Sequence, residues 1–251
     1  MTDWSGTTDV DVVEGVLRLR RREMRWLSTG WDGGFTDGGV AYSISVPEGW
    51  ERTDLDSYVR ERCDDAGFEE PGPALLTGVD MRHARIARAG PVLAAATAGV
   101  SNPASLPVPV TDSRGDVRDG DTAHADTTAA DTPGRGTVNV LLTVDCRLDD
   151  GALANLVAVA AEAKAATLLA TTGFPGTTTD AVVVGSARDA ESATFSGSAT
   201  PVGSAARACV RDAVRASLAS RYDAGDRSIP DSVADAEYGV VTDRETEVFS
   251  P

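Results

Sequence analysis

The residues best able to do chemistry lie in one helix-forming stretch, 152–170, which is otherwise almost free of polar side chains. Its only charges are Glu162 and Lys164, and Asn155 is its only amide. Lys164 is also the only lysine of the chain. The spacing of seven residues puts Asn155 and Glu162 on one helix face, whereas Lys164 points about 200° around the helix from Glu162.

A helix that is apolar nearly all round is usually buried, and buried charges need partners. Two interpretations follow. In one, Lys164 is a cation near the end of a helix, and its ammonium group either reaches water or pairs with an acid. In the other, Asn155, Glu162 and Lys164 line a polar site.

Further polar residues stand where apolar segments begin or end. Ser101 and Asn102 close one apolar segment, Asn139 interrupts another, and 177–180 leads into a third. Residues 196–200 precede the last predicted helix, whose free N–H groups could hold an anion. Each position is also ordinary as a cap or turn, but their number suggests a shared pocket.

Several common types of site are absent from the sequence. The chain has only two histidines, His83 and His124, and no H-E-x-x-H, so a histidine-built zinc site is not expected. The nearest approach to G-x-S-x-G is Gly99–Pro103, where proline replaces the last glycine. Phosphate-binding G-x-x-x-x-G-K-[ST] and dinucleotide-binding G-x-G-x-x-G loops are also missing. The sequence therefore predicts no metal site and no nucleotide site.

Periodicity and turn residues predict the elements that position these groups. Strands are expected at 12–28 (with 21–26 as a candidate second strand), 40–46, 74–80, 91–100, 137–146 and 181–185. Helices are expected at 55–66, 152–170 and 202–221. Residues 30–39 and 171–179 read as loops, and 81–88 as a basic connecting segment.

The strands come in groups with the helices gathered between them. This favours an α+β fold, a single-domain α/β sandwich with a mixed, largely antiparallel sheet and packed helices. The domain is expected to span 12–222. Residues 107–135, which contain His124, have almost nothing to bury and predict an acidic, disordered insertion. Residues 223–251 predict an acidic, loosely attached tail.

The composition indicates the habitat more than the task. Asp and Glu number 39 against 23 Lys and Arg, a net charge of −16, and arginine replaces lysine almost everywhere. This pattern is typical of proteins from a salty cytoplasm and disfavours nucleic-acid or membrane partners. Cys63, Cys146 and Cys209 are odd in number and far apart, which favours a reducing compartment. With no apolar leader at the N-terminus, a cytoplasmic location is predicted, and the oligomeric state is unknown.

Five segments in order resemble a known family, the archaeal adenosylcobinamide amidohydrolases, over nearly the whole chain. They are GVSNPAS (99–105), GTVNVLLTVD (136–145), AEAKAATL (161–168), GTTTDAVVVGS (176–186) and FSGSATPVGSAARACVRDAV (195–214). The run LLTGVDMR, which ends at Arg82, fits the family as well. The insertion at 107–135 and the Phe174–Pro175 turn depart from the family, and both lie in predicted loops.

The resemblance implies hydrolysis of the amide that joins the aminopropanol arm to the corrin ring of adenosylcobinamide. The products would be adenosylcobyric acid and 1-amino-2-propanol, in the salvage of coenzyme B12. The corrinoid is then the substrate, and no separate cofactor is implied. The alternatives are a non-catalytic corrinoid-binding protein and an amidohydrolase of another substrate on the same fold.

Amide hydrolysis needs a nucleophile, a proton donor for the leaving amine and stabilisation of the oxyanion. Glu162, if buried as expected, is the first candidate to activate water and protonate the amine. Asp180 is the alternative base. In a second mechanism Ser101, or one of the threonines at 177–179, forms an acyl-enzyme.

The remaining polar residues are assigned to substrate binding. Asn102 and Asn139 are expected to donate N–H groups to the oxyanion or to corrin amides. Lys164 is expected to hold an anionic group of the substrate or to pair near Glu162. The other predicted binding residues are Asn155, Thr178, Ser196 and Thr200.

Overall fold

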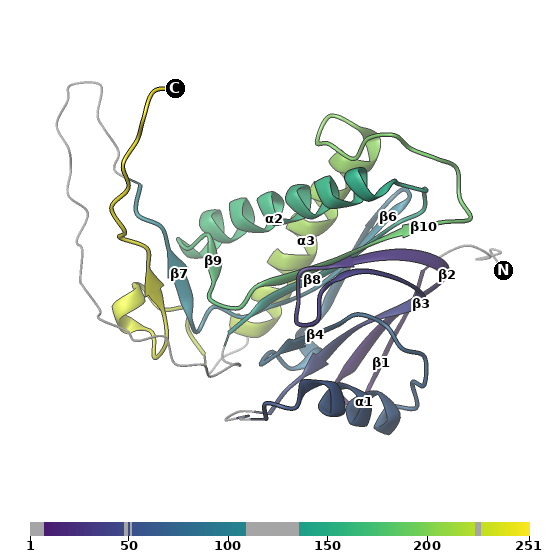
Figure 1. Cartoon of the computed structure of the whole chain (residues 1–251). Coiled ribbons are helices and arrows are strands. Elements are labelled where there is room, and N and C mark those ends of the chain that lie inside the picture. The colour runs from purple at the N-terminus through teal and green to yellow at the C-terminus, as the bar shows by residue number, and fades with distance from the viewer. Residues whose placement is uncertain (1–7, 48–49, 51, 109–135, 224–226) are drawn as a thin grey trace.

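The structure is a computed structural model that describes residues 8–47, 50, 52–108, 136–223 and 227–251. It has an α+β fold, as predicted, built on one eight-stranded mixed sheet (Figure 1). The predicted insertion, His124 included, lies almost wholly outside the described residues.

The strand order of the main sheet is β4-β3-β2-β10-β8-β6-β5, and β1 pairs with β2. The strands are β1 (Asp9–Val13), β2 (Val16–Ser28), β3 (Gly34–Ser45), β4 (Ala74–Thr77), β5 (Arg85–Ala89), β6 (Val92–Ala98), β8 (Val138–Val144) and β10 (Ala181–Ala187). Only β3–β4 and β8–β10 are parallel, so the prediction of a largely antiparallel sheet is confirmed.

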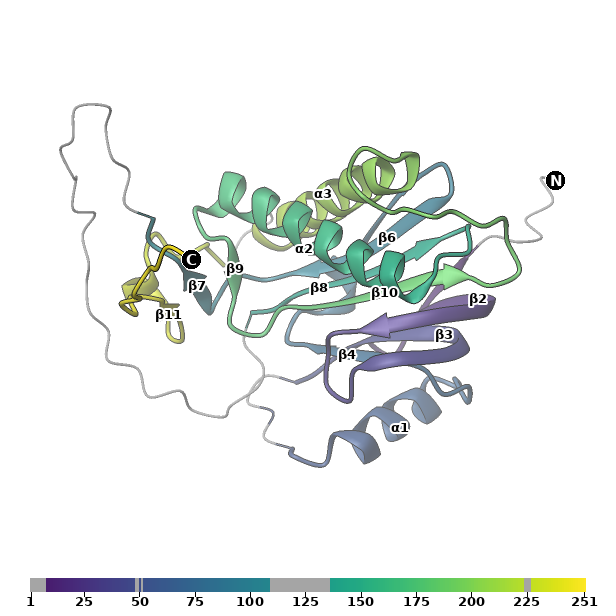
Figure 2. The ribbon, with the colours of Figure 1, turned by 45° about the horizontal axis from the view of Figure 1, so that its top comes forward.

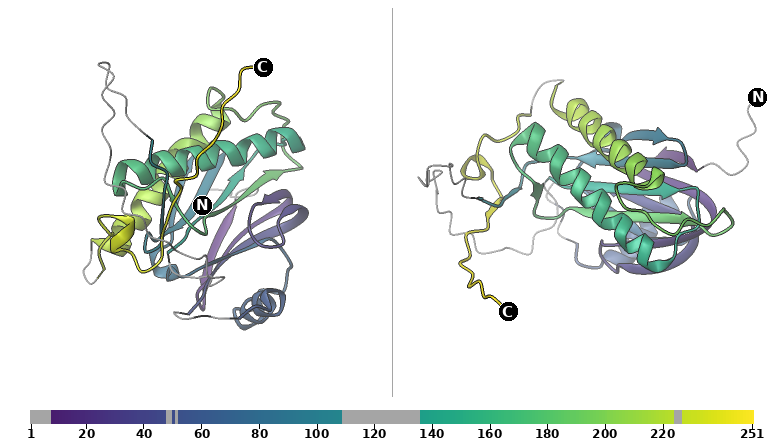
Figure 3. Two further views of the ribbon diagram at one scale, coloured as in Figure 1. Left: turned by 60° about the vertical axis from the view of Figure 1, so that its left-hand side comes forward. Right: turned by 90° about the horizontal axis from the view of Figure 1, so that it is seen from above.

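Three helices pack on this sheet: α1 (Leu55–Asp65), α2 (Asp150–Thr172) and α3 (Pro201–Tyr222). Side-chain caps start the two long ones, because Asp149 accepts from the Ala152 N–H and Thr200 accepts from the Gly203 N–H. Gly173 ends α2 in the left-handed region, at φ +79°. In Figure 3, α2 and α3 lie side by side over one part of the sheet, and α1 lies away from them.

The sheet folds over on itself, so that it has an inner face. Leu17, Trp26 and Leu75 from β2 and β4 pack in one buried cluster with Leu93 and Leu141 from β6 and β8. Figure 2 shows β2, β3 and β4 lying below β8 and β10. The opposite face of β6, β8 and β10 packs under α2 and α3, and β3 packs against α1.

A second, three-stranded sheet has the order β11-β7-β9, formed by β7 (Pro103–Ser105), β9 (Gly176–Thr177) and β11 (Val240–Val241). Because β11 pairs with β7, the expectation of a loosely attached tail is wrong for this part of residues 227–251. Ile229 and Val233 also pack against the core under α2 and α3. The few apolar residues of the acidic tail attach it to the domain.

Three other predicted segments need correction. Residues 30–39 are a loop only as far as Gly33, because β3 begins at Gly34 and pairs with β2. The basic segment 81–88 holds a short 3₁₀ helix (Met81–His83) and the start of β5. The strand predicted at 12–28 is broken at Glu14–Gly15, where both residues have positive φ and β1 turns back on β2.

Among the described residues, α2 is the one helix long and apolar enough to cross a membrane by length and composition. Half of its most apolar window is buried inside the protein. Leu153, Leu156 and Leu168 belong to the core cluster between the helices and the sheet. Its apolar character is explained by this packing, as for the core helix of a soluble domain.

Candidate functional site

Several of the predicted site residues meet where β8 and β10 begin and β6 ends. Asp180, just before β10, is at the centre. Its carboxylate accepts from the Val138 N–H at 2.9 Å, the Thr177 N–H at 3.1 Å and the Thr177 hydroxyl at 2.5 Å, and from the Lys164 ammonium group. A carboxylate has about four acceptor positions, so these four donors fill them.

Lys164 and Asp180 form a buried ion pair, with each side chain only 10% exposed. Lys164 therefore meets an acid and does not reach water, which is one of the two outcomes that the first sequence-based interpretation allowed. Its Nζ lies 3.6 Å from the position that a Cβ would take on Gly176, at the start of β9. The pair thus ties α2 to the strand β9 and to the start of β10.

Asn102 and Thr178 hold the loop after β6 to the loop before β10. The Asn102 Nδ2 donates to the Thr178 hydroxyl at 2.5 Å, and the Thr178 N–H donates to the Asn102 carbonyl at 3.2 Å. Gly136, at φ +81°, packs directly on this loop. A Cβ there would lie 2.5 Å from the Ser101 nitrogen and hydroxyl and from Asn102 Oδ1, so only glycine fits.

Asn139 lies one residue beyond the Asp180 contact at Val138. Its Nδ2 donates to the Leu76 carbonyl at 2.8 Å. In both Asn102 and Asn139 the buried atom without a partner among the described residues is the amide oxygen. Each amide nitrogen already donates one N–H to a protein oxygen. The expectation that these side chains offer N–H groups to the substrate therefore rests on the second N–H and stays a prediction.

We call this set the Asp180 cluster. It comprises Ser101, Asn102, Thr137, Asn139, Lys164, Thr177, Thr178, Thr179 and Asp180. Thr137 was not predicted as a site residue. It stands two residues before Asn139, and its contact with Thr179 depends on which loops meet, which spacing along the chain does not give.

The other predicted residues lie on α2 and in the loop before α3. The Glu162 side chain is 58% exposed and pairs with Arg207 of α3, so the expectation that it is buried is wrong. Asn155 is exposed and donates to the Ser196 hydroxyl at 3.0 Å, which in turn donates to the Ala152 carbonyl at 2.6 Å. Thr200 caps α3. These four residues stabilise the packing of the loop before α3 onto α2.

A groove of about 680 Å³ runs between α2 and α3. Its floor is made of small residues such as Ala163, Thr167 and Thr171, and Arg207 and Arg211 lie at its sides. Arg207 is paired with Glu162 and Arg211 with Asp212. Two of the three arginines that line the groove, the third being Arg215, therefore have acidic partners.

The end of α3 also reaches the Asp180 cluster. The Tyr222 hydroxyl accepts from the Val100 N–H at 2.8 Å, and a Cβ on Gly99 would lie 3.2 Å from Arg221 Nε. The sequence identified both residues only as the end of a helix. They support the loop that carries Ser101 and Asn102.

The cysteines are not suited to nucleophilic roles. All three are buried and unpaired. Burial raises the pKa of Cys63 to about 11, and it also raises the pKa of Cys146 and of Cys209. In the part of the chain that the structure describes, no group of three or more His, Cys, Asp or Glu side chains is placed to hold a metal ion.

Comparison with known proteins identifies the family. Residues 6–226 match the family model described as adenosylcobinamide amidohydrolase. A protein of that name from Halobacterium salinarum is 55% identical over 240 residues, which cover 95% of this chain and 97% of the relative. A second, from Methanosarcina mazei, is 30% identical over 159 residues, 63% of this chain and 67% of the relative.

The chain belongs to the adenosylcobinamide amidohydrolase family. Four of the five segments whose sequence resembles this family, those around Ser101, Val138, Lys164 and Asp180, meet in the Asp180 cluster. The match to the Halobacterium salinarum protein also agrees with the acidic, arginine-rich composition.

Proposed function

We propose that this protein hydrolyses the amide between the aminopropanol arm and the corrin ring of adenosylcobinamide, giving adenosylcobyric acid and 1-amino-2-propanol. The observation that carries the proposal is the meeting of four family segments, up to about 80 residues apart in sequence, at the buried Lys164–Asp180 pair. The corrinoid is the substrate, its cobalt belongs to it, and the reaction takes place in the cytoplasm at high salt.

We place the reaction at the Asp180 cluster in preference to Glu162. Glu162 lies in solvent beside Arg207, where nothing excludes water from an attacking group. At the Asp180 cluster the charged pair is buried next to an unpaired amide oxygen of Asn102. A buried site of this kind strengthens the electrostatic interactions that stabilise a developing charge.

Each residue of the cluster then has a defined task. Ser101 faces the reacting carbonyl, because the threonines at 177–179 are engaged with Asp180, Asn102 and Thr137. The Lys164 ammonium has three N–H donors, of which one is held by Asp180, so it can stabilise the oxyanion and give a proton to the leaving amine. The proton released by the attacking hydroxyl then returns to Lys164, so that the proton count balances. Asp180, whose acceptor positions are filled, positions Lys164 and the loop at Thr177.

The test is product analysis with purified protein in molar salt. Adenosylcobinamide is expected to give adenosylcobyric acid and one equivalent of 1-amino-2-propanol, separated by chromatography. A folded protein that binds adenosylcobinamide and returns it intact would indicate the alternative, a corrinoid-binding protein. A protein that neither binds nor cleaves it would contradict both.

A further inference from the structure

The inner face of the folded sheet contains three buried polar side chains that the cluster's chemistry has not used. They are Ser43 of β3, Thr97 of β6 and Asn139 of β8, which are 4%, 2% and 2% exposed. Each has one side-chain oxygen without a hydrogen-bond partner among the described residues. Buried polar atoms in folded proteins are nearly always paired, so three on one face point to a bound group.

The pairing of the strands places these side chains near one another. Thr97 lies directly opposite Asn139 in the antiparallel β6–β8 pair, which brings their Cβ atoms to within about 4.5–5.5 Å. Both follow the alternation of Leu93 and Leu141, which point to the inner face. The inner face is therefore polar at this end, and it is apolar at Leu93, Ala95 and Leu141.

Ser43 reaches the same place from the other half of the sheet. It pairs with Leu75 of β4, and Ala41 and Leu75 lie in the inner cluster. The next residue of β4, Leu76, accepts through its carbonyl from Asn139 Nδ2 at 2.8 Å. This bond closes the edge strand β4 over β8, so that Ser43 and Asn139 lie on facing parts of the sheet.

The chemistry of the unpaired atoms defines the group that fits. The Asn139 nitrogen donates one N–H to the Leu76 carbonyl, and its side-chain oxygen, an acceptor, has no partner among the described residues. The hydroxyls of Ser43 and Thr97 can accept or donate. None of the three is charged, so the matching group is neutral, and it carries at least one N–H or O–H donor for the Asn139 oxygen.

We propose that Ser43, Thr97 and Asn139 bind such a neutral hydrogen-bond donor, either a water molecule or a terminal carboxamide of the substrate, beside the Asp180 cluster. Asn139 follows Val138, whose N–H is held by Asp180, so the bound group lies one residue along β8 from that contact, on the inner face of the sheet. Binding of a substrate carboxamide rests on the proposed function, whereas binding of a water molecule does not.

The deciding variant is Thr97→Val, which keeps the side-chain shape and removes the hydroxyl. If a water is bound, the Tm of the substrate-free variant falls below that of Thr97→Ser, because the water loses a partner. If a substrate carboxamide is bound, the Tm stays or rises and KM for adenosylcobinamide increases on the order of tenfold, with kcat changed less. An unchanged KM with an unchanged or raised Tm would overturn the proposal.

Thr143→Val is the matched control. Thr143 is equally buried on β8, on the face of Leu141 and Asn139, but its hydroxyl is paired with Thr8 at 3.0 Å. This variant should lower the Tm and leave KM unchanged. Ser43→Ala repeats the test should Thr97→Val fail to fold. The Tm readings need no turnover, so an inactive wild-type protein would contradict the proposed function and leave the water test intact.

Discussion

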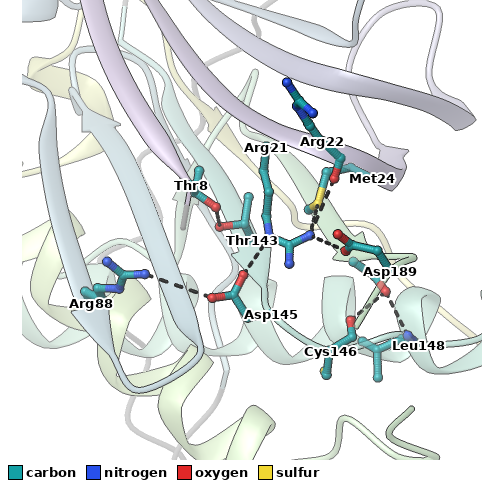
Figure 4. Close-up of polar contacts among 11 residues, drawn as sticks. Thr8, Arg21, Arg22, Met24, Arg88, Thr143, Asp145, Cys146, Leu148 and Asp189 are labelled. Carbon is teal, nitrogen blue, oxygen red and sulfur yellow. Dashed lines mark hydrogen bonds and ion pairs between the residues drawn. The ribbon is translucent and has the colours of Figure 1, made fainter. Parts of the chain in front are cut away.

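At each end of the neighbouring strands β8 and β10, a buried cation from another element pairs with one or two carboxylates. The two ends differ in how deeply these charges are buried. Where the strands end, Arg21 of β2 pairs with Asp145 at 2.8 Å and with Asp189 at 3.0 Å (Figure 4). Arg21 is 8% exposed, but its partners are 27% and 48% exposed. Where the strands begin, Lys164 and Asp180 are each 10% exposed, so both charges are buried.

The polar atoms around the two pairs differ as well. Beside Arg21, the Thr8 and Thr143 hydroxyls pair with each other, and Ser186 donates to the Cys146 carbonyl and accepts from the Leu148 N–H. Beside Asp180, the oxygens of Asn102 and Asn139 have no partner among the described residues. The Arg21 end therefore holds the sheet together, whereas under the proposed function the Asp180 end receives the substrate.

The largest expected effect comes from Lys164→Met. This variant leaves the Asp180 carboxylate buried without its cation, which should cost about 3–5 kcal/mol of stability, and it removes the proposed acid, so turnover should be lost. Denaturant unfolding and product analysis in molar salt measure both. Adding Asp180→Asn should restore part of the stability and none of the activity.

Arg21→Met is the matched variant at the other end. Its carboxylates can be hydrated, so the loss should be smaller, about 1.5–3 kcal/mol for hydrogen bonds to charged groups, and the folded fraction should keep its turnover. An equal loss of specific activity in both variants would remove the distinction between the two ends.

Ser101→Ala tests whether the Asp180 end carries out the reaction. The side chain is small and at a loop, so the Tm should stay within a few degrees, while turnover should fall about 10²-fold or more. Hydroxylamine added to the wild-type reaction would trap an acyl-enzyme as a hydroxamate of the corrinoid. Full activity of the alanine variant would remove Ser101 from the mechanism.

Glu162→Gln should have a much smaller effect. Exposed ion pairs contribute about 0–1 kcal/mol, and the Glu162–Arg207 pair lies in solvent, so stability and turnover should both stay close to wild type. The sequence-based role of Glu162 as the base is still a prediction, and this variant decides it. A loss of turnover on the order of 10²-fold with the fold intact would move the reaction to α2.

The sequence predicted the fold class, the three helices and most strands of the main sheet, because their apolar residues repeat with regular periods. It could not predict which face of α2 is buried, since alanine and leucine occur all round it, and this is why Glu162 was expected inside. The Lys164–Asp180 pair and the small β11-β7-β9 sheet depend on contacts between distant segments. The residue types were enough to name the candidate site residues. Only the folded structure shows that Asn155, Ser196 and Thr200 lie apart from the Asp180 cluster.

The smallest expected effect concerns His83, which lies near the end of α3 on the side of the Asp180 cluster. Its Nδ1 lies 3.1 Å from the Ser220 hydroxyl, and its Nε2 accepts from Arg82 at 3.1 Å. Desolvation lowers the pKa of His83, and the positive charges of Arg82 and Arg221 lower it further. The folded protein therefore holds this histidine neutral at a pH where the unfolded chain, with a pKa near about 6.5, already binds a proton.

The sign of the pH dependence follows from this difference. Above about pH 6.5 the neutral His83 contributes its full stability, and this contribution is lost as the pH falls through the lowered pKa of the folded state. His83→Gln keeps a hydrogen-bonding side chain that does not titrate. The difference in Tm between wild type and variant should therefore shrink or reverse from pH 7 to pH 5, and taking the difference cancels the titration of the surface acids. If the curves of Tm against pH for wild type and variant run parallel, the pKa of His83 is the same in the folded and the unfolded protein. That result would contradict the lowering of its pKa by burial and by Arg82 and Arg221.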